Sequence, residues 1–384
     1  MFLCVLYILT GAYTASPGID VVRKQVAKYI EKRDAKYSDY ENVFLSNGAT
    51  DGVRAVMTLV NHSTTGKPPG VMIPIPQYPL FSALVQEYGM YQIDYFLDEE
   101  NDWAIDVKEL RRAIRESRKH CDPRMLVVIN PGNPSGFVLS KKDIKDIIRF
   151  AYEESLFILA DEVYQFNVYE DGLHFYSFKK ILTEMGPPYN ELELASFMSA
   201  SKGFMGECGS RGGFCEIINL DPGVKKMFWK YISSHLCSST IGQAMIYCIT
   251  NPPHPNEPSY DKFMKEKTAI LQSLKERANF VTKTFNSIKG LECKKVVGAM
   301  YAFPRIFIPQ KVIEKAKGMG IEPDELYGLE LLETVGVCII PGNQFGQRPG
   351  TYHFRMTFLP QIDDVKIILQ RINKFQKIFM EKYQ

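Results

Sequence analysis

Short apolar runs alternate with helix-patterned stretches through residues 18–161, and this alternation constrains the fold of the chain more than any other feature. The β-type runs are 43–46, 71–75, 91–96, 125–130 and 156–161. The stretches with helical spacing of apolar residues are 18–34, 106–116 and 140–154. Alternation of this kind predicts an α/β fold with a largely parallel sheet and helices on both faces. In such a sheet, the loops that follow the strands form a binding crevice at one edge.

The length and the later part of the chain predict two domains. A chain of 384 residues exceeds what one ordinary core accommodates. A proline-rich break at 252–258 precedes one long charged helix at 259–289, and we place the domain change within this helix. Strands near 301–308 and 336–341 and a final helix at 363–382 predict a small α+β domain. The predicted divisions are 1–16 as the remnant of an N-terminal arm, 17–272 as the large domain and 273–384 as the small domain.

The charge balance argues against attraction to nucleic acid or an acidic membrane, because 46 Lys and Arg oppose 44 Asp and Glu. A small-molecule partner therefore fits better. The eight cysteines are scattered without a CxxC pair, which indicates free thiols in a reducing, cytoplasmic compartment, with a mitochondrial location as the alternative. The apolar run 2–9 is short and lacks a basic start, so we interpret it as neither a signal peptide nor a membrane span. We expect a soluble protein.

The segment SASKGFMGECGSRGG (199–213) places Lys202 among small hydroxyl residues and glycines, with Arg211 nine positions later. A lysine that lies close to other cations and away from bulk water has a lowered pKa, and its amine can then form a Schiff base. A lysine without such neighbours is usually a solvated surface residue. Four other segments favour the chemical role for Lys202.

Asp161 follows an apolar strand in the first of these segments, LADEVY (159–164). In the crevice, its carboxylate would keep a bound pyridine nitrogen protonated, and the ring would then act as an electron sink. At an effective dielectric constant near 20, the attraction is roughly 4 kcal/mol, or about three pKa units. The alternative interpretation is a helix-capping aspartate after a strand.

Three loops after β-type runs supply further candidate groups. Asn133, in NPGNPSG (130–136), can donate a hydrogen bond to a ring hydroxylate, although such a segment by itself indicates a turn. Gly48, in LSNGATDGV (45–53), leads into a predicted helix whose free amide groups suit a phosphate, but the segment matches neither a Walker loop nor GxGxxG. Tyr78, in PQYP (76–79), is either a ring that stacks on a planar ligand or an ordinary packed side chain.

Six segments together resemble the fold-type I pyridoxal-phosphate aminotransferases of class I/II. They are GAYTASPGI (11–19), NPGNPSGFVLS (130–140), DEVYQ (161–165), SASKGFMGECGSRGG (199–213), GAMYAFPR (298–305) and PGNQFGQRPGTYHFRMTFLP (341–360). They extend over nearly all of the chain, and the similarity is greatest to the alanine-specific group of the family. The resemblance implies a mostly parallel, seven-stranded sheet covered by helices in a large domain, a smaller C-terminal α+β domain, pyridoxal 5'-phosphate as the cofactor, and a homodimer.

The motif positions imply roles for residues around the ring of the cofactor. Lys202 would hold the cofactor covalently, and Asp161 would pair with its pyridine nitrogen. Asn133 and Tyr164 would bond the ring oxygen. Tyr78 would stack on the ring.

The resemblance also implies how the phosphate and the substrate are bound. The phosphate would be held by backbone amides, hydroxyls and a guanidinium, from Gly48, Ala49, Thr50, Ser199, Ser201 and Arg211. Tyr13 would reach this phosphate from a second subunit. Arg355 would grip the substrate α-carboxylate with its two-pronged guanidinium, next to Asn133.

The implied reaction is a ping-pong transfer without a metal, in which the amino group of L-alanine passes to 2-oxoglutarate and leaves pyruvate and L-glutamate. Lys202 would move the proton. Two alternatives accompany this prediction. Family members normally have a longer segment before the GAY motif, so one alternative is an N-terminally truncated homologue that binds the cofactor but is catalytically weak. The other is a related fold-type I enzyme with another amino-acid substrate.

Overall fold

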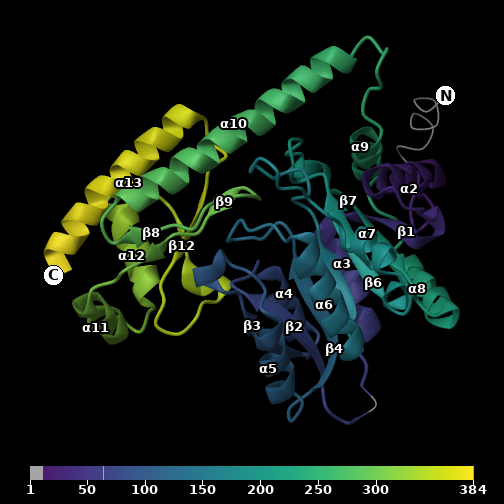
Figure 1. Cartoon of the computed structure of the whole chain (residues 1–384), viewed down its shortest axis with the longest axis horizontal. Helices are drawn as coiled ribbons and strands as arrows, with labels where there is room; N and C mark the ends of the chain where they lie inside the picture. Colours follow the sequence, from purple (N-terminus) through teal and green to yellow (C-terminus); the bar gives the residue numbers. More distant parts are fainter. Residues whose placement is uncertain (1–11, 64, 384) are drawn as a thin grey trace.

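The computed structural model describes residues 12–63 and 65–383, and its central feature is a seven-stranded sheet of order β1-β7-β6-β5-β4-β2-β3 (Figure 1). The strands are β1 (Val43–Asn47), β2 (Pro69–Ile75), β3 (Tyr91–Phe96), β4 (Asp122–Ile129), β5 (Phe157–Asp161), β6 (Leu194–Ser199) and β7 (Gly212–Ile218). β7 pairs antiparallel with β1 and with β6, whereas the pairs among β2 to β6 are parallel. The predicted largely parallel sheet is confirmed, and each of the five predicted runs forms a strand of it.

Helices cover both faces of this sheet, because its inner strands are apolar on both sides. β4 turns Leu126 and Val128 to one core cluster and Met125, Val127 and Ile129 to the other. The helices are α2 (Asp20–Asp34), α3 (Ala49–Met57), α4 (Leu80–Glu87), α5 (Val107–Ser117), α6 (Lys141–Glu153), α7 (Phe178–Met185), α8 (Pro222–Ser234) and α9 (Thr240–Thr250). Residues of α5, α6 and α7 pack on the first face, and residues of α3, α4 and α8 pack on the second.

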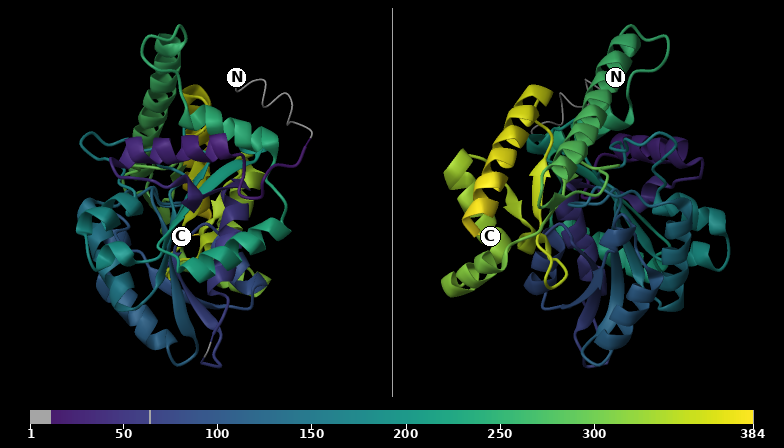
Figure 2. Two further views of the ribbon diagram at one scale, coloured as in Figure 1. Left: turned by 90° about the vertical axis from the view of Figure 1, so that its right-hand side faces the viewer. Right: turned by 60° about the vertical axis from the view of Figure 1, so that its left-hand side comes forward.

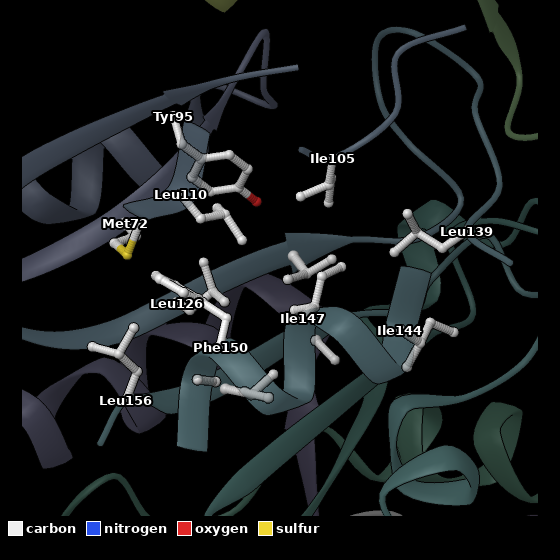
Figure 3. Packing of buried hydrophobic residues seen from close by; sticks show 14 of the residues in the cluster. Met72, Tyr95, Ile105, Leu110, Leu126, Leu139, Ile144, Ile147, Phe150 and Leu156 are labelled. Atoms are coloured by element: carbon white, nitrogen blue, oxygen red, sulfur yellow. The ribbon is translucent and has the colours of Figure 1, made fainter. Parts of the chain in front are cut away.

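The packing on the first face is visible around α6 (Figure 3). Ile144, Ile147 and Phe150 lie on one side of this helix at the spacing of an amphipathic helix and contact the sheet. The helix begins at a capping box, in which the Ser140 hydroxyl and the Asp143 carboxylate satisfy backbone amides that have no partner in the helix. Local sequence and tertiary burial therefore specify the same helix.

The C-terminal part forms a second core around two small antiparallel sheets. Their strands are β8 (Leu291–Glu292), β9 (Tyr301–Ala302), β10 (Arg305–Ile306), β11 (Ile340–Pro341) and β12 (Phe354–Thr357). The helices are α10 (Tyr260–Ser287), α11 (Gln310–Met319), α12 (Pro323–Val335) and α13 (Ile362–Tyr383). The 3₁₀ helices of the chain are η1 (Tyr40–Asn42), η2 (Thr58–Val60), η3 (Glu99–Asn101), η4 (Tyr189–Glu191), η5 (Cys208–Ser210) and η6 (Gly342–Phe345).

The long predicted helix near 259–289 is α10, which runs without a break through the expected domain change. Its buried residues begin at Leu274, and from there it packs beside α13 (Figure 2). The first half of α10 extends away from this core toward the end of α9 (Figure 1). One helix thus connects the two cores.

Two further expectations from the sequence concern the thiols and membrane-spanning segments. The cysteines at 121, 208, 215, 237, 248, 293 and 338 are all free, and four of them are buried or half-buried. Within 12–63 and 65–383, no helix is both long and apolar enough to cross a membrane. Cys4 and the apolar run 2–9 lie outside the described residues.

Candidate functional site

A cavity of about 200 Å³ lies at the edge of the sheet where β5 and β6 end, and most of the predicted site residues line it. Its lining residues are Ala49, Thr50, Val53, Tyr78, Leu80, Asn133, Asp161, Val163, Tyr164, Ser199, Ser201, Lys202, Cys208 and Arg211. They come from segments that are far apart in the sequence but follow neighbouring strands, as expected for an α/β sheet.

Asp161 is the last residue of β5 and is buried at the floor of the cavity. Burial raises the pKa of its carboxyl to about 6, against the opposing effects of the Val163 amide and of Lys202. The Val163 N–H donates to Oδ1 at 3.3 Å. A buried carboxylate with so few partners favours a cationic ligand beside it.

Lys202 follows β6 and faces two tyrosine hydroxyls. Its Nζ lies 3.4 Å from the Tyr301 hydroxyl and 5.5 Å from the centre of the Tyr164 ring. The two hydroxyls are 3.4 Å apart. Burial raises the pKa of Tyr301, but the charge of Lys202, the bond from Tyr164 and the charge of Arg355 outweigh burial, so the net direction is downward.

Tyr301 was not among the predicted site residues. It lies in β9, which belongs to the C-terminal core, 99 positions after Lys202. Its motif, GAMYAFPR, was among the segments that resemble the family, and this was the available signal. Nothing in its local pattern distinguishes it from a packed strand tyrosine.

Arg355, in β12, belongs to the same core; it does not itself line the cavity but contacts Asn133, which does. Its Nη1 donates to Oδ1 of Asn133 at 3.1 Å, and the Asn133 amide donates to the Tyr164 hydroxyl at 3.4 Å. The guanidinium lies over the rings of Tyr301 and Phe345, with distances of 4.2 and 4.7 Å to the ring centres. All of these contacts are with neutral groups, so they hold a planar cation at the cavity without neutralising its charge.

The other end of the cavity is built from glycines and Arg211. Gly48 precedes α3 with φ 79°, and a Cβ there would lie 2.5 Å from Nη2 of Arg211. That nitrogen donates to the Asn47 carbonyl at 3.0 Å. A Cβ on Gly213 would lie 2.6 Å from the Gly48 carbonyl carbon. Close packing of this turn thus requires glycine at both positions.

Ala49 and Thr50, in the first turn of α3, also line this end, and no side chain caps the helix. The N-terminal amides of a helix carry partial positive charge and suit an anion. Ser199 and Ser201 also line the cavity, and the Ser201 N–H donates to the Ser199 hydroxyl at 3.1 Å. This end therefore combines hydroxyls, amides and a guanidinium.

Tyr78 and Tyr13 differ in their positions. Tyr78 lines the cavity and is 40% exposed, so one part of its ring is free. Tyr13 is 80% exposed and does not line the cavity of its own chain. The neighbouring Thr14 bonds with Cys237 and Gln243, which holds this segment near α9.

The residues present fit pyridoxal phosphate. The cavity offers one amine at Lys202, one buried carboxylate at Asp161, and an anion-binding end around Arg211. These groups match the carbonyl, the pyridine nitrogen and the phosphate of that cofactor.

Residues 10–372 match the family model described as "Aminotransferase class I and II". The chain belongs to this family. It uses pyridoxal phosphate, and its substrates are amino acids and 2-oxo acids.

Among aminotransferases, the chain is 54% identical to alanine aminotransferase 2 of Xenopus laevis over 375 residues, which cover 97% of this chain and 69% of the relative. It is 49% identical to alanine aminotransferase 1 of Homo sapiens, with 97% and 76% covered. The solved alanine aminotransferase from Pyrococcus furiosus superposes with a TM-score of 0.82 at 23% identity, covering 98% of this chain and 86% of that one. This last likeness shows the fold.

Proposed function

We propose that this aminotransferase moves the amino group of L-alanine to 2-oxoglutarate and forms pyruvate and L-glutamate. The observation that carries the proposal is the identity of about half of all residues, over 97% of the chain, with proteins named alanine aminotransferase. The site supports it, because the cavity contains an amine and a buried carboxylate, and a guanidinium held by neutral groups contacts its wall at Asn133.

In the proposed mechanism, the Lys202 amine would hold the cofactor until the substrate amino group takes its place, and the freed amine would then move a proton of the substrate α-carbon. When bound, pyridoxal phosphate supplies an electron sink for the charge that develops at that carbon. The Tyr301 hydroxyl, 3.4 Å from Nζ, keeps the amine directed into the cavity. General base catalysis requires such positioning.

Asp161 is proposed to bind the pyridine nitrogen, and its burial makes this ion pair stronger than one in water. Tyr78 is proposed to stack on the ring, and Asn133 and Tyr164 to bond its oxygen. The phosphate is assigned to the opposite end, where it would meet Gly48, Ala49, Thr50, Ser199, Ser201 and Arg211.

Arg355 is proposed to bind the substrate α-carboxylate. Its contacts with Asn133, Tyr301 and Phe345 hold the guanidinium plane in one orientation. A fixed plane presents two parallel N–H groups to a carboxylate, which lysine cannot do. The substrate is thereby oriented before the proton is moved.

A homodimer is proposed in which Tyr13 reaches the phosphate of the other subunit. Tyr13 is 80% exposed, and Leu236 and Ile241, which lie near the start of α9, are 56% and 65% exposed. Exposed apolar side chains in one region favour a protein interface. We further propose a cytoplasmic location and a domain division at 272/273, where the burial of α10 begins.

Purified protein loaded with pyridoxal phosphate tests the proposal. We expect borohydride to fix the cofactor to Lys202, and alanine with 2-oxoglutarate to give pyruvate. Lys202→Ala should abolish both, and its residual turnover would refute the mechanism. Cofactor binding without pyruvate would favour a catalytically weak homologue, whereas turnover of a different amino acid would favour a related enzyme.

A further inference from the structure

His353 is a buried histidine two residues before Arg355, and it lies outside the cavity. It is 1% exposed. Its ring stacks on Phe303 with centres 4.8 Å apart and planes 3° apart, and Trp103 meets it edge-on at 5.7 Å. The ring is therefore fixed in position and removed from water.

Both ring nitrogens of His353 face oxygen atoms. Nε2 lies 3.1 Å from Oε1 of Glu99, and Nδ1 lies 3.0 Å from Oε1 of Gln347. The amide nitrogen of Gln347 donates to Oδ2 of Asp324 at 3.1 Å, which turns its oxygen toward the histidine. A carboxylate oxygen and an amide oxygen both accept, so the ring N–H finds an acceptor in either tautomer. The imidazole is thus held on both sides.

The charges around His353 come from several elements. Arg305 lies 3.7 Å from Oε2 of Glu99 and 3.4 Å from Glu100, and Lys294 lies 3.6 Å from Glu100. Glu99 is thus placed between the His353 ring and the Arg305 guanidinium. Asp324 faces the far side of Gln347.

These contacts join the two cores. Glu99 begins η3, which comes shortly after the end of β3 of the large sheet. His353 immediately precedes β12 of the C-terminal core. Residues two apart on an extended strand point to the same side. His353 pairs with Arg305 in an isolated bridge, so this extended geometry already applies at His353.

We infer that His353, held between Glu99 and Gln347, is a positioning residue that fixes Arg355 for the substrate carboxylate. The inference rests on the proposed role of Arg355. It assigns His353 no contact with substrate or cofactor. A shift of the strand by even about 1 Å would spoil a bidentate grip, which is why its anchoring affects binding.

The test uses the cofactor-loaded enzyme and two probes, aminooxyacetate and methoxyamine. Both form an oxime at the cofactor carbon that Lys202 would hold and release the Lys202 amine, but only aminooxyacetate carries a carboxylate. The ratio of their reaction rates, followed by absorbance, therefore isolates the carboxylate grip from cofactor chemistry. Pyruvate formation by the unchanged enzyme tests the proposed function separately.

His353→Phe retains a flat ring for the stack on Phe303 and removes both ring nitrogens. We expect the probe ratio to fall at least tenfold and the KM for alanine to rise similarly, with kcat changed less than threefold. His120→Phe is the matched control, because His120 is exposed and also stacks on a ring, that of Tyr91. It should leave the ratio unchanged.

Glu99→Gln is the second variant, since it retains an oxygen acceptor and removes the charge. We expect its probe ratio to fall at least threefold, and this variant decides the question if His353→Phe does not fold. A wild-type ratio in folded, cofactor-loaded His353→Phe, or in Glu99→Gln when the former is unfolded, would overturn the inference.

Discussion

Replacing Gly48 by alanine should weaken cofactor binding through Arg211. Gly48 has φ 79° and ψ 169°, a region that is essentially restricted to glycine, and the strain of a side chain there is about 1–3 kcal/mol. In addition, the new Cβ would lie 2.5 Å from Nη2 of Arg211, whereas ordinary contact begins near 3.4 Å. The guanidinium would have to move away by about the difference between these two distances.

The displacement would remove one charge-assisted hydrogen bond, worth about 1.5–3 kcal/mol. If Arg211 binds the phosphate, the Kd for pyridoxal phosphate should rise roughly ten- to a hundredfold. Equilibrium titration of the cofactor-free protein by absorbance measures this change. Urea unfolding measures the strain separately.

Gly186→Ala is a closely matched control. Gly186 has φ 69° and ψ −174°, the same backbone region, but a Cβ there would meet no atom within 4 Å. Gly186→Ala should lose about as much unfolding free energy as Gly48→Ala. It should bind the cofactor with the affinity of the wild type. Equal cofactor affinity in the two variants would refute the assignment of Arg211 to the phosphate.

Three further variants test individual side chains. Burial raises the pKa of Glu162 to about 8. The unfolding free energy of the wild type should therefore fall as the pH rises from 4.5 to 8, by up to about 1.4 kcal/mol per pH unit. Glu162→Gln should remove that slope in urea unfolding, and parallel pH curves would contradict this. Tyr301→Phe should lower kcat about fivefold, because it loses the bond to Lys202 worth about 1 kcal/mol, while KM stays unchanged. Arg355→Lys should raise the KM of both substrates about a hundredfold with an unaltered cofactor spectrum, and an unchanged KM would exclude the proposed carboxylate site.

The strands that are buried on both faces of the sheet could be predicted from the sequence. Runs such as 125–130 and 156–161 are continuous in apolar residues, and the structure places them as β4 and β5. β6 and β7 were not predicted. β7 begins with Gly212 and Gly213, and consecutive glycines in a sequence usually indicate a loop. Only the structure shows that Gly213 packs closely against Gly48 within the sheet.

The site was predictable to the extent that its residues end neighbouring strands. Asp161 and Ser199 are the last residues of β5 and β6, so their approach follows from the topology. The raised pKa of Asp161 was not predictable, because the burial that causes it depends on how distant segments pack around the end of β5.

The large sheet supplies residues that line the cavity, whereas the C-terminal core supplies residues that contact them. Lys202 and Asp161 stand at the ends of rigid strands, beside groups proposed for the cofactor. Tyr301 and Arg355 come from β9 and β12, so their distance from Lys202 depends on how the two cores pack. That packing is set by contacts such as Glu99 with His353, between residues 254 positions apart. A local pattern carries no information on such a distance, which explains why Tyr301, beside Lys202 but in the C-terminal core, was not predicted.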